Sequence, residues 1–531
     1  MTKRAGILVA VGATVAGLLT AAPGPAAATA ASTPPAPKLK WTDCPTESYP
    51  TLQCAKVRAP LDHRRPSGRQ VTLALSRVPH TAKTFQGPLL VNPGGPGGSG
   101  LSMAGFVASS LPKKVAAQYD VIGFDPRGVG KSTPALNCLP GHFDPVRPDS
   151  VPTSYRAERI NRDRAESFAR ACGEKHGDVL PYMDTVSAAK DLDVIRRALG
   201  SRQLNYFGYS YGTYLGAVYA KLYPERVRRL VLDSVVDPDD VWYEGNLGQD
   251  YAFDARHKAF AAWVAKNDAA YGLGTDPARV EAAWYRMRAD VARKPAGGTV
   301  GASELEDTFL PGGYYNGYWP YLAEAFAAYV KDRDAEALVE VYENFGAVDA
   351  SGDNGYSVYT AVQCRDAGWP EHWSTWRNDS RRIHKKAPFM TWNNTWYNAP
   401  CANWPVPSLR PLPVNNRQPA PGADPPGHGR RGDPVRRRGQ HAPQAQGLQP
   451  RRGGGRRQPR HHAERQRLPG QASDGLSHRR DGAARPGRGG RGLRRPAGAE
   501  AAARREGGGP VGGQQQGQPS ARPAGLPPLS R

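Results

Sequence analysis

The sequence predicts an α/β fold: a mostly parallel sheet with helices on both faces and a helical cap inserted after the sheet. Short apolar runs, typical of buried strands, alternate with segments of helical periodicity up to about residue 237. The runs at 88–92, 119–124 and 204–207 each lead into a glycine-rich or polar turn. From residue 238 to 404 the pattern changes to amphipathic helices rich in Trp and Tyr. Alternating strands and helices favour a parallel sheet that is covered on both faces.

The first 30 residues have the pattern of a signal peptide. Lys3 and Arg4 precede an apolar run from Gly6 to Thr20, and small residues follow at 26–30. The run is short for a membrane span, and no later stretch is apolar enough to be one. We therefore expect a secreted, extracellular protein; a single membrane anchor is the alternative. Residues 31–40 are expected to be a linker or the remnant of a propeptide.

The six cysteines fit an exported protein. Six cysteines allow 15 connectivities, and proximity in the chain suggests one of them: Cys44 with Cys54, Cys138 with Cys172, and Cys364 with Cys401. No C-x-x-C or Cys/His pattern is present, so we expect no metal and no cofactor.

The expected core spans residues 41–237. An antiparallel hairpin is predicted from 55–58 and 71–78, and a buried strand follows at Pro88–Asn92. This strand runs into Pro93-Gly-Gly-Pro-Gly-Gly-Ser-Gly100, whose backbone amides can approach a ligand closely. The loop suits an oxyanion hole, a phosphate cradle or a simple turn. Because no Gly-Lys-Ser/Thr ending follows it, the phosphate cradle is the weaker interpretation.

The segment Leu204–Tyr219 contains the candidate catalytic residue. An apolar run ends at Phe207, Gly208-Tyr-Ser-Tyr-Gly212 follows, and helical periodicity comes next. Strand, G-x-S-x-G and helix together predict a nucleophile elbow with Ser210 at its apex. The amide of Tyr211, at the start of the helix, would then face the oxygen that becomes negative during acyl transfer.

The cap is predicted to bury substrate behind aromatic side chains, although most of these aromatics are expected simply to form its own core. Carboxylates gather where the chain leaves the sheet: Asp237, Asp239, Asp240 and Glu244. Asp237 and Glu244 are our candidates for holding a substrate amine; a solvated acidic turn is the alternative. Residues 405–420 are expected to return to a truncated core.

The last segment, 421–531, differs in composition from the rest. It has 23 Arg, no Lys and 7 acidic residues, so it carries +16 of the net charge of +23. It contains no Phe, Tyr, Trp, Ile or Lys, and such a segment cannot bury a core. We expect it to be disordered. The first 420 residues carry only +7, so global charge does not identify a substrate.

The motifs in sequence resemble the secreted tripeptidyl aminopeptidases of actinobacteria. These motifs are Asn92–Gly100, Asp125-Pro-Arg-Gly-Val-Gly-Lys-Ser132, Asp191–Arg196, the elbow, and Val231–Asp237. These enzymes are serine peptidases of the α/β-hydrolase fold, related to prolyl aminopeptidases. The resemblance covers roughly 40–418. It implies that Ser210 attacks the scissile carbonyl, that the amides of Tyr211 and Gly95 receive the oxyanion, and that short peptides leave from free N-termini.

The departure from this family lies in the last segment. The family's catalytic Asp and His should follow the nucleophile, after late strands, yet nothing after Gln418 has a strand pattern. His428, His441, His461, His462 and His478 have no catalytic setting. We interpret 421–531 as an out-of-frame translation. Read one nucleotide later, codons 422–435 can encode Val-Leu-Ile-Leu-Gln-Gly-Thr-Val-Asp-Ala-Ala-Thr-Pro-Tyr, and codons 457–467 can encode Gly-Asn-His-Gly-Ile-Thr-Leu-Ser-Gly-Asn.

The sequence thus predicts a secreted serine aminopeptidase that acts on peptides with a free N-terminus and is impaired because its triad Asp and His are missing. An esterase or lipase of the same fold is one alternative. Another is an inactive secreted protein whose basic arm binds polyanions. Nucleic acid is expected as a partner only through that arm, a membrane is not expected, and the oligomeric state is left open.

Overall fold

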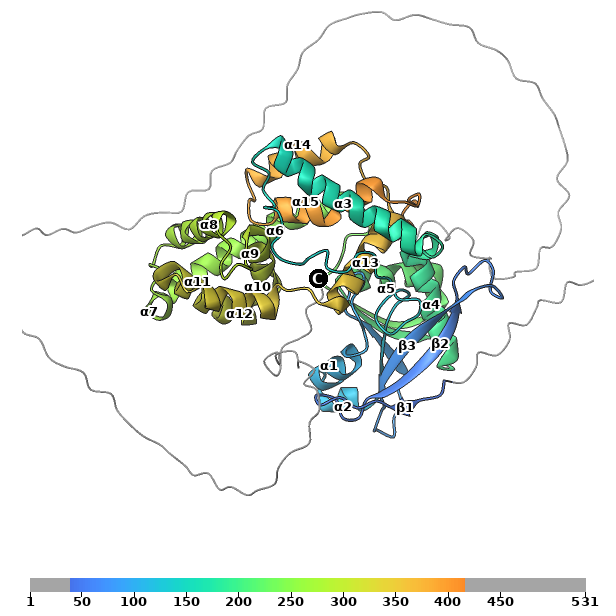
Figure 1. Ribbon diagram of the computed structural model, residues 1–531. Coiled ribbons are helices and arrows are strands. Elements are labelled where there is room, and N and C mark those ends of the chain that lie inside the picture. The colour runs from blue at the N-terminus through green and yellow to red at the C-terminus, as the bar shows by residue number, and fades with distance from the viewer. Residues whose placement is uncertain (1–38, 416–531) are drawn as a thin grey trace, which may run out of the picture. The chain divides into compact units, whose positions relative to one another are not determined.

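Within the described residues, 39–415, seven strands form one mixed sheet in the computed structural model (Figure 1). The strands are β1 (Thr42–Asp43), β2 (Gln53–Pro60), β3 (Gln70–Val78), β4 (Pro88–Asn92), β5 (Asp120–Phe124), β6 (Leu204–Tyr209) and β7 (Val227–Asp233). Their spatial order is β1-β2-β3-β5-β4-β6-β7. The first three are antiparallel to their neighbours, and β5, β4, β6 and β7 run parallel. The predicted hairpin and the mostly parallel sheet are confirmed.

Helices cover both faces of this sheet. The helices of this part are α1 (Met103–Ser110), α2 (Lys113–Ala116), α3 (Tyr155–His176), α4 (Thr185–Ala198) and α5 (Tyr211–Leu222), with 3₁₀ turns at Leu180–Tyr182 and Pro224–Arg226. Successive side chains of the buried strand β4 point to opposite faces. Leu89 and Val91 pack in the cluster of α1, whereas Leu90 packs in the larger cluster of α4 and α5.

The helices after β7 form the predicted cap. They are α6 (Tyr243–Lys266), α7 (Asp268–Tyr271), α8 (Pro277–Arg293), α9 (Ala302–Phe309), α10 (Pro311–Tyr314), α11 (Trp319–Asp332) and α12 (Ala335–Phe345), with a 3₁₀ turn at Asn316–Tyr318. They share a hydrophobic core of their own, centred on buried side chains such as Trp284 and Phe326. Helices α8, α11 and α12 confirm that this part of the chain contains the expected amphipathic helices.

The remaining helices join the cap to the sheet. They are α13 (Ala350–Asp366), α14 (Trp373–His384) and α15 (Thr391–Asn398), followed by a 3₁₀ turn at Ala399–Asn403. Tyr356 and Ala361 of α13 are buried in the same cluster as the sheet and α4. Helix α13 therefore packs with the core, although it follows the cap in sequence.

Three disulfides connect the cysteines in the expected pairs: Cys44–Cys54, Cys138–Cys172 and Cys364–Cys401. No helix among residues 39–415 is long and apolar enough to cross a membrane. The predicted signal peptide and the predicted out-of-frame segment, with its five histidines, lie outside the described residues.

Candidate active site

Ser210 occupies the sharp turn between β6 and α5. Its backbone has φ 52° and ψ −124°, a conformation that costs energy for any residue except glycine. The turn is fixed on both sides, because the Ser210 amide donates to the Asp233 carbonyl at 3.0 Å and Thr213 Oγ1 donates to the Ser210 carbonyl at 2.6 Å. A Cβ on Gly212 would lie 2.8 Å from Asn92 Oδ1, so the second glycine of the motif is needed for close packing against β4. This is the geometry of a nucleophile elbow.

The glycine-rich loop lies directly against this turn. A Cβ on Gly94, where φ is +96°, would lie 2.6 Å from the Tyr209 carbonyl and 2.9 Å from Ser210 Cβ. Within residues 39–415 the amides of Gly95 and Tyr211 donate to no acceptor, and both residues line the cavity in front of Ser210. Two free amides beside a serine are what an oxyanion hole requires. This role of Gly95 and Tyr211 stays a prediction.

Asp125, at the end of β5, holds the far end of this loop. Its Oδ1 accepts hydrogen bonds from Ser99 Oγ at 2.6 Å and from the Gly100 amide at 3.1 Å, and its Oδ2 accepts one from the Lys131 amide at 2.8 Å. Burial raises the pKa of Asp125, and these donors partly offset that effect. The motif around Asp125 thereby fixes the loop that presents Gly95.

A second buried carboxyl lies behind the first turn of α5. The Tyr211 hydroxyl is 2.9 Å from Thr185 Oγ1, which donates to Asp366 Oδ2 at 2.5 Å. The Thr185 amide donates to Asp366 Oδ1 at 2.7 Å. Burial, with Asp184 nearby, raises the pKa of Asp366 to about 7. This chain of contacts connects α4, α13 and the residue that carries the candidate oxyanion amide.

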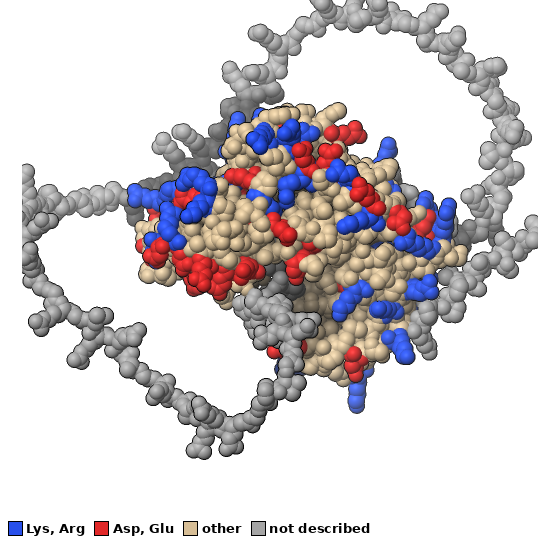
Figure 2. Space-filling view, viewed as in Figure 1, with Lys and Arg blue, Asp and Glu red and all other residues tan. Residues whose placement is uncertain are grey.

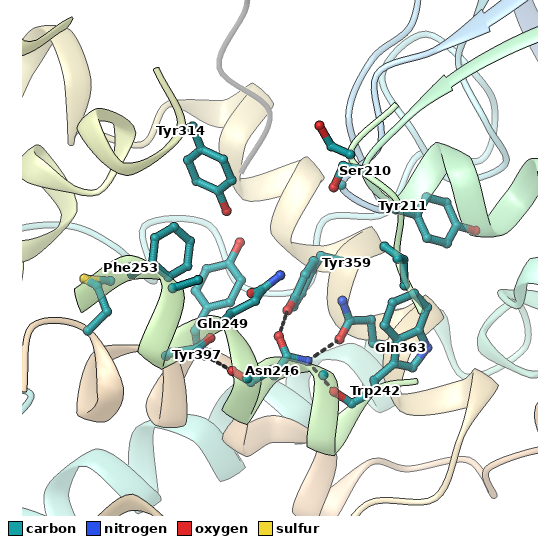
Figure 3. A pocket seen from close by; sticks show the side chains of 18 of the residues that line it. Ser210, Tyr211, Trp242, Asn246, Gln249, Phe253, Tyr314, Tyr359, Gln363 and Tyr397 are labelled. Atoms are coloured by element: carbon teal, nitrogen blue, oxygen red, sulfur yellow. Dashed lines mark hydrogen bonds between the residues drawn. The ribbon is translucent and has the colours of Figure 1, made fainter. Parts of the chain in front are cut away.

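A cavity of about 640 Å³ opens in front of Ser210, between the sheet and the cap (Figure 3). Its apolar wall is aromatic and comes mainly from Phe253, Tyr314, Tyr359 and Tyr397. Side-chain amides supply the polar wall: Asn246, Gln249, Gln363, Asn393 and Asn394. Asn246 is held by hydrogen bonds to the Trp242 carbonyl at 2.9 Å and to Gln363 Oε1 at 3.1 Å. Sequence patterns did not single out these amides, because they come from helices far apart in the chain.

Carboxylates lie at the rim of the cavity. The predicted amine ligands Asp237 and Glu244 both line it and are exposed, as is Asp240. No ion pair with a described Lys, Arg or His engages any of the three. Asp307 also lines the cavity, but Arg147 pairs with it at 2.5 Å. The first three carboxylates are therefore available to a positively charged ligand.

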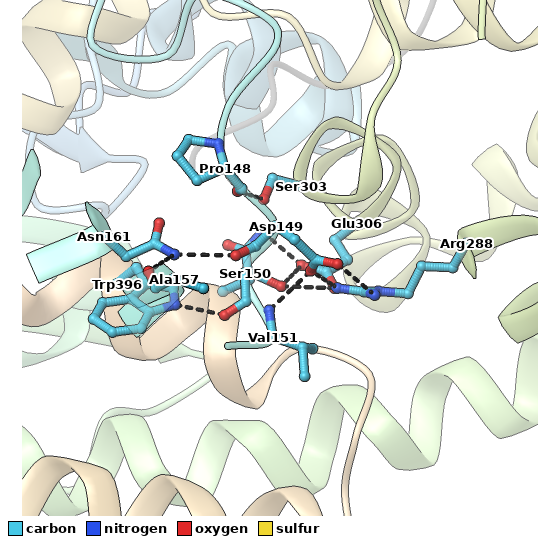
Figure 4. A network of polar contacts seen from close by, with 11 residues as sticks. Pro148, Asp149, Ser150, Val151, Ala157, Asn161, Arg288, Ser303, Glu306 and Trp396 are labelled. Carbon is cyan, nitrogen blue, oxygen red and sulfur yellow. Dashed lines mark hydrogen bonds and ion pairs between the residues drawn. The ribbon is translucent and has the colours of Figure 1, made fainter. Parts of the chain in front are cut away.

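A buried network of charges fixes the cap beside the cavity (Figure 4). Arg288 of α8 pairs with Glu306 of α9 at 2.7 Å and with Asp149 at 2.6 Å. Asn393 Nδ2 donates to Glu306 Oε2 at 3.2 Å and to Asp307 Oδ1 at 3.3 Å. The network thus holds α8, α9, α15 and the loop around Asp149 together, and it orients one of the amides of the cavity wall.

The described part of the chain supplies no base for Ser210. None of the histidines in residues 39–415 lines the cavity, and no group there accepts a hydrogen bond from Ser210 Oγ. His63, for example, bonds to Asp191 at 2.9 Å, beside the buried Arg127. The site as described therefore has a nucleophile, two free amides and a substrate cavity.

The comparisons with known proteins agree with this geometry. Residues 87–327 match a family model described as alpha/beta hydrolase fold. The chain is 47% identical over 389 residues to the tripeptidyl aminopeptidase of Streptomyces lividans, a match that covers 71% of this chain and 72% of that protein.

Two mycobacterial proteins are more distant. The serine protease Hip1 of Mycobacterium tuberculosis is 34% identical over 399 residues, covering 70% of this chain and 75% of that protein. A carboxylesterase B of the same species is 34% identical over 428 residues, covering 76% and 82%. The level of identity to the Streptomyces enzyme, over most of its length, shows that this chain belongs to the tripeptidyl aminopeptidase family of serine peptidases with the α/β-hydrolase fold.

Proposed function

We propose that this chain is built to release tripeptides from the free N-termini of peptides through an acyl-enzyme on Ser210. The observation that carries the proposal is the elbow of Ser210 at the bottom of a cavity whose rim holds three unpaired carboxylates. The similarity to the Streptomyces tripeptidyl aminopeptidase supports a length of three residues for the released peptide.

The reaction would begin with attack of Ser210 Oγ on the scissile carbonyl carbon. The carbonyl oxygen then becomes negative and accepts hydrogen bonds from the amides of Gly95 and Tyr211. Removing one such donor typically costs about 10²- to 10³-fold in rate. Collapse of this intermediate breaks the C–N bond, and the leaving amine takes up the proton that Ser210 Oγ gave up on attack, carried by a base that residues 39–415 do not supply. Water then hydrolyses the ester to free the N-terminal fragment.

The rim carboxylates explain why a free N-terminus would be selected. An ammonium group close to Asp237 or Glu244 gains charge-assisted hydrogen bonds, which are about twice as strong as neutral ones. The cavity volume lies within the usual range for bound small ligands. Its aromatic wall and its amides suit the side chains and the backbone of a short peptide.

We further propose that the protein encoded by this sequence is impaired, because the proton of Ser210 has no acceptor within residues 39–415. Loss of triad members costs about 10⁴- to 10⁶-fold in rate. The strand, Asp and His that the neighbouring frame can encode after codon 421 would follow β7 in the order that this fold requires. Export remains part of the proposal; the apolar N-terminal segment and the three disulfides support it.

The test compares two proteins: the chain as encoded, and a frame-restored protein with one base deleted near codon 421. Each is assayed with a tripeptidyl p-nitroanilide that has a free amine and with its N-acetylated counterpart. We expect the frame-restored protein to cleave only the free substrate and its Ser210→Ala variant to be inactive. Equal cleavage of the N-acetylated substrate would contradict an amine-selecting site.

An esterase is the second candidate, because the chain is also 34% identical to a protein named carboxylesterase B. A p-nitrophenyl ester without an amine distinguishes the two functions. An esterase turns over this ester at a rate that substitution of Asp237 or Glu244 leaves unchanged, and it gains nothing from a free amine on the acyl group. A peptidase of the proposed kind favours the acyl group with a free amine and loses that advantage when Asp237 or Glu244 is replaced.

A further inference from the structure

Among residues 39–415, strand β7 is the last strand on one side of the sheet. It pairs with β6 on one side, and no strand within residues 39–415 pairs with its other side. The Asp233 carbonyl accepts a hydrogen bond from the Ser210 amide, so the polar groups of Asp233 face β6. Backbone groups alternate in direction along a regular strand. The N–H and C=O groups of Leu230 and Leu232 therefore point outward, where they can accept another strand.

The side chains of β7 also differ between its two faces. Leu230 and Leu232 are partly buried against the main hydrophobic cluster. Arg229, Val231 and Asp233 are exposed on the other face, and 48% of Val231 is accessible. Neither Arg229 nor Asp233 forms an ion pair with any described residue. An edge strand with an exposed apolar centre, and with charged side chains that form no ion pair, can pair with another strand.

The sequence of β7 is complementary to itself in one antiparallel register. Residues that face each other across a two-fold axis must lie on the same face of the sheet, so registers differ by steps of two residues. With Val231 opposite Val231 of a second copy, Arg229 lies opposite Asp233 and Leu230 opposite Leu232. The two neighbouring registers instead place Val231 opposite Arg229 or opposite Asp233. One register alone thus pairs both charges and both valines.

We propose that β7 is a self-association surface, at which two copies of this chain join their sheets antiparallel around Val231. The two Leu230–Leu232 pairs are then hydrogen-bonded pairs, each of which exchanges two N–H···O bonds. The Val231 pair lies between them, where opposite side chains approach most closely. The proposal concerns the chain as encoded, and it does not depend on the proposed peptidase activity.

The test is sedimentation velocity of the full chain and its variants over a concentration series. The wild type is expected to be a dimer. Val231→Lys, which places two lysines face to face, is expected to be a monomer. Val115→Lys is the matched control, since Val115 is 39% exposed on α2, and it should leave the dimer intact. Far-UV circular dichroism and the thermal midpoint confirm that each variant is folded.

Charge reversal provides the decisive comparison. Arg229→Asp or Asp233→Arg alone creates two like-charge contacts per dimer and should raise the dimer Kd about tenfold or more. The double variant Arg229→Asp/Asp233→Arg restores opposite charges and should recover most of the affinity. A dimer that is insensitive to these changes uses another surface, and failure of the double variant to recover excludes this register. Either result overturns the proposal.

Hydrogen exchange of the peptide that covers 228–233 tests whether a second copy covers the outer side of β7. In the dimer its outward amides should be protected, and Val231→Lys should remove that protection. A monomeric wild-type chain overturns the proposal. If its β7 amides are nevertheless protected, residues outside 39–415 cover the edge, and the second copy is not its partner.

Discussion

Replacing Asp250 with Asn is expected to raise the free energy of unfolding at neutral pH. Asp250 lies on α6, is 1% exposed, and accepts a hydrogen bond from Asn394 Nδ2 at 2.8 Å. The other residues that line the small cavity beside it are uncharged: Tyr243, Asn246, Leu247, Trp369, Trp376, Ser380, Asn394, Thr395 and Asn398. Burial therefore raises the pKa of Asp250 from 3.8 to about 8.

The size of the effect follows from proton linkage. The folded protein holds the proton of Asp250 more tightly than the unfolded chain does. Its contribution to stability is complete below about pH 3.8 and is lost as the pH rises to about 8. At 1.36 kcal/mol per pKa unit, the loss reaches roughly 4 kcal/mol at pH 7. Asn resembles the protonated carboxyl in shape and cannot ionise, so Asp250→Asn avoids this loss.

The assay is urea unfolding of both proteins, followed by tryptophan fluorescence with the disulfides intact, between about pH 4 and pH 8. The two proteins should be similarly stable at the acid end, and the variant should gain stability as the pH rises. Asp332→Asn, at an exposed position on α11, is the control and should show no such gain. A stability difference between Asp250→Asn and wild type that stays constant with pH would refute the argument.

Three further predictions concern the nucleophile loop, a disulfide and a buried ion pair. Gly94→Ala, measured in the frame-restored protein, should lower kcat more than it raises KM, because the new methyl group lies too close to the Tyr209 carbonyl beside Ser210. Removing the Cys138–Cys172 disulfide with paired alanines should lower the free energy of unfolding by about 3 to 4 kcal/mol, more than removal of Cys44–Cys54, because it closes the longer loop; equal losses in urea unfolding would argue against this. Arg127→Met should lower the free energy of unfolding by about 3 to 5 kcal/mol in the same assay. The substitution leaves Asp191 buried without the two hydrogen bonds of 2.7 Å that Arg127 donates. The double variant Arg127→Met/Asp191→Leu should recover much of that loss, and no recovery would contradict the reasoning.

Much of the fold could be predicted because its signals are local. Buried strands such as β4 are short apolar runs that lead into a glycine-rich or polar turn, and α8, α11 and α12 have regular apolar spacing. Helix α3 gives a weaker signal, because it is highly charged and buries few apolar side chains, among them Phe168 and Cys172. Ser154, which caps the helix by accepting a hydrogen bond from the Ala157 amide, is the sequence signal that marks where α3 begins.

The first turns of helix α13 give little helical signal in the sequence. Its first turns contain Ser, Gly, Asp and Asn, which are poor helix formers. Packing of Tyr356 and Val358 into the core outweighs this propensity, and Asp349 caps the helix by accepting a hydrogen bond from the Gly352 amide. Tertiary contacts of this kind leave no periodic pattern in the sequence.

The candidate site also has one part that the sequence predicts and another that it does not. Ser210 and its loop could be predicted, because strand, turn and helix follow one another within a few residues. The cavity wall could not, because Gln363, Asn393 and Tyr397 meet Ser210 only through the arrangement of α13 and α15. The carboxylates Asp237 and Glu244 were identified because they lie where the chain leaves the sheet, close in sequence to β7.

The most direct test of the account is the rate of tripeptidyl p-nitroanilide hydrolysis by the chain as encoded, measured beside the frame-restored protein and its Ser210→Ala variant. We predict that the encoded chain is slower than the frame-restored protein by about 10⁴-fold or more. We also predict that an N-acetyl group abolishes turnover by the active form. If the encoded chain matches the frame-restored protein, Ser210 has a base other than the histidine of the neighbouring frame, and the proposed impairment is wrong.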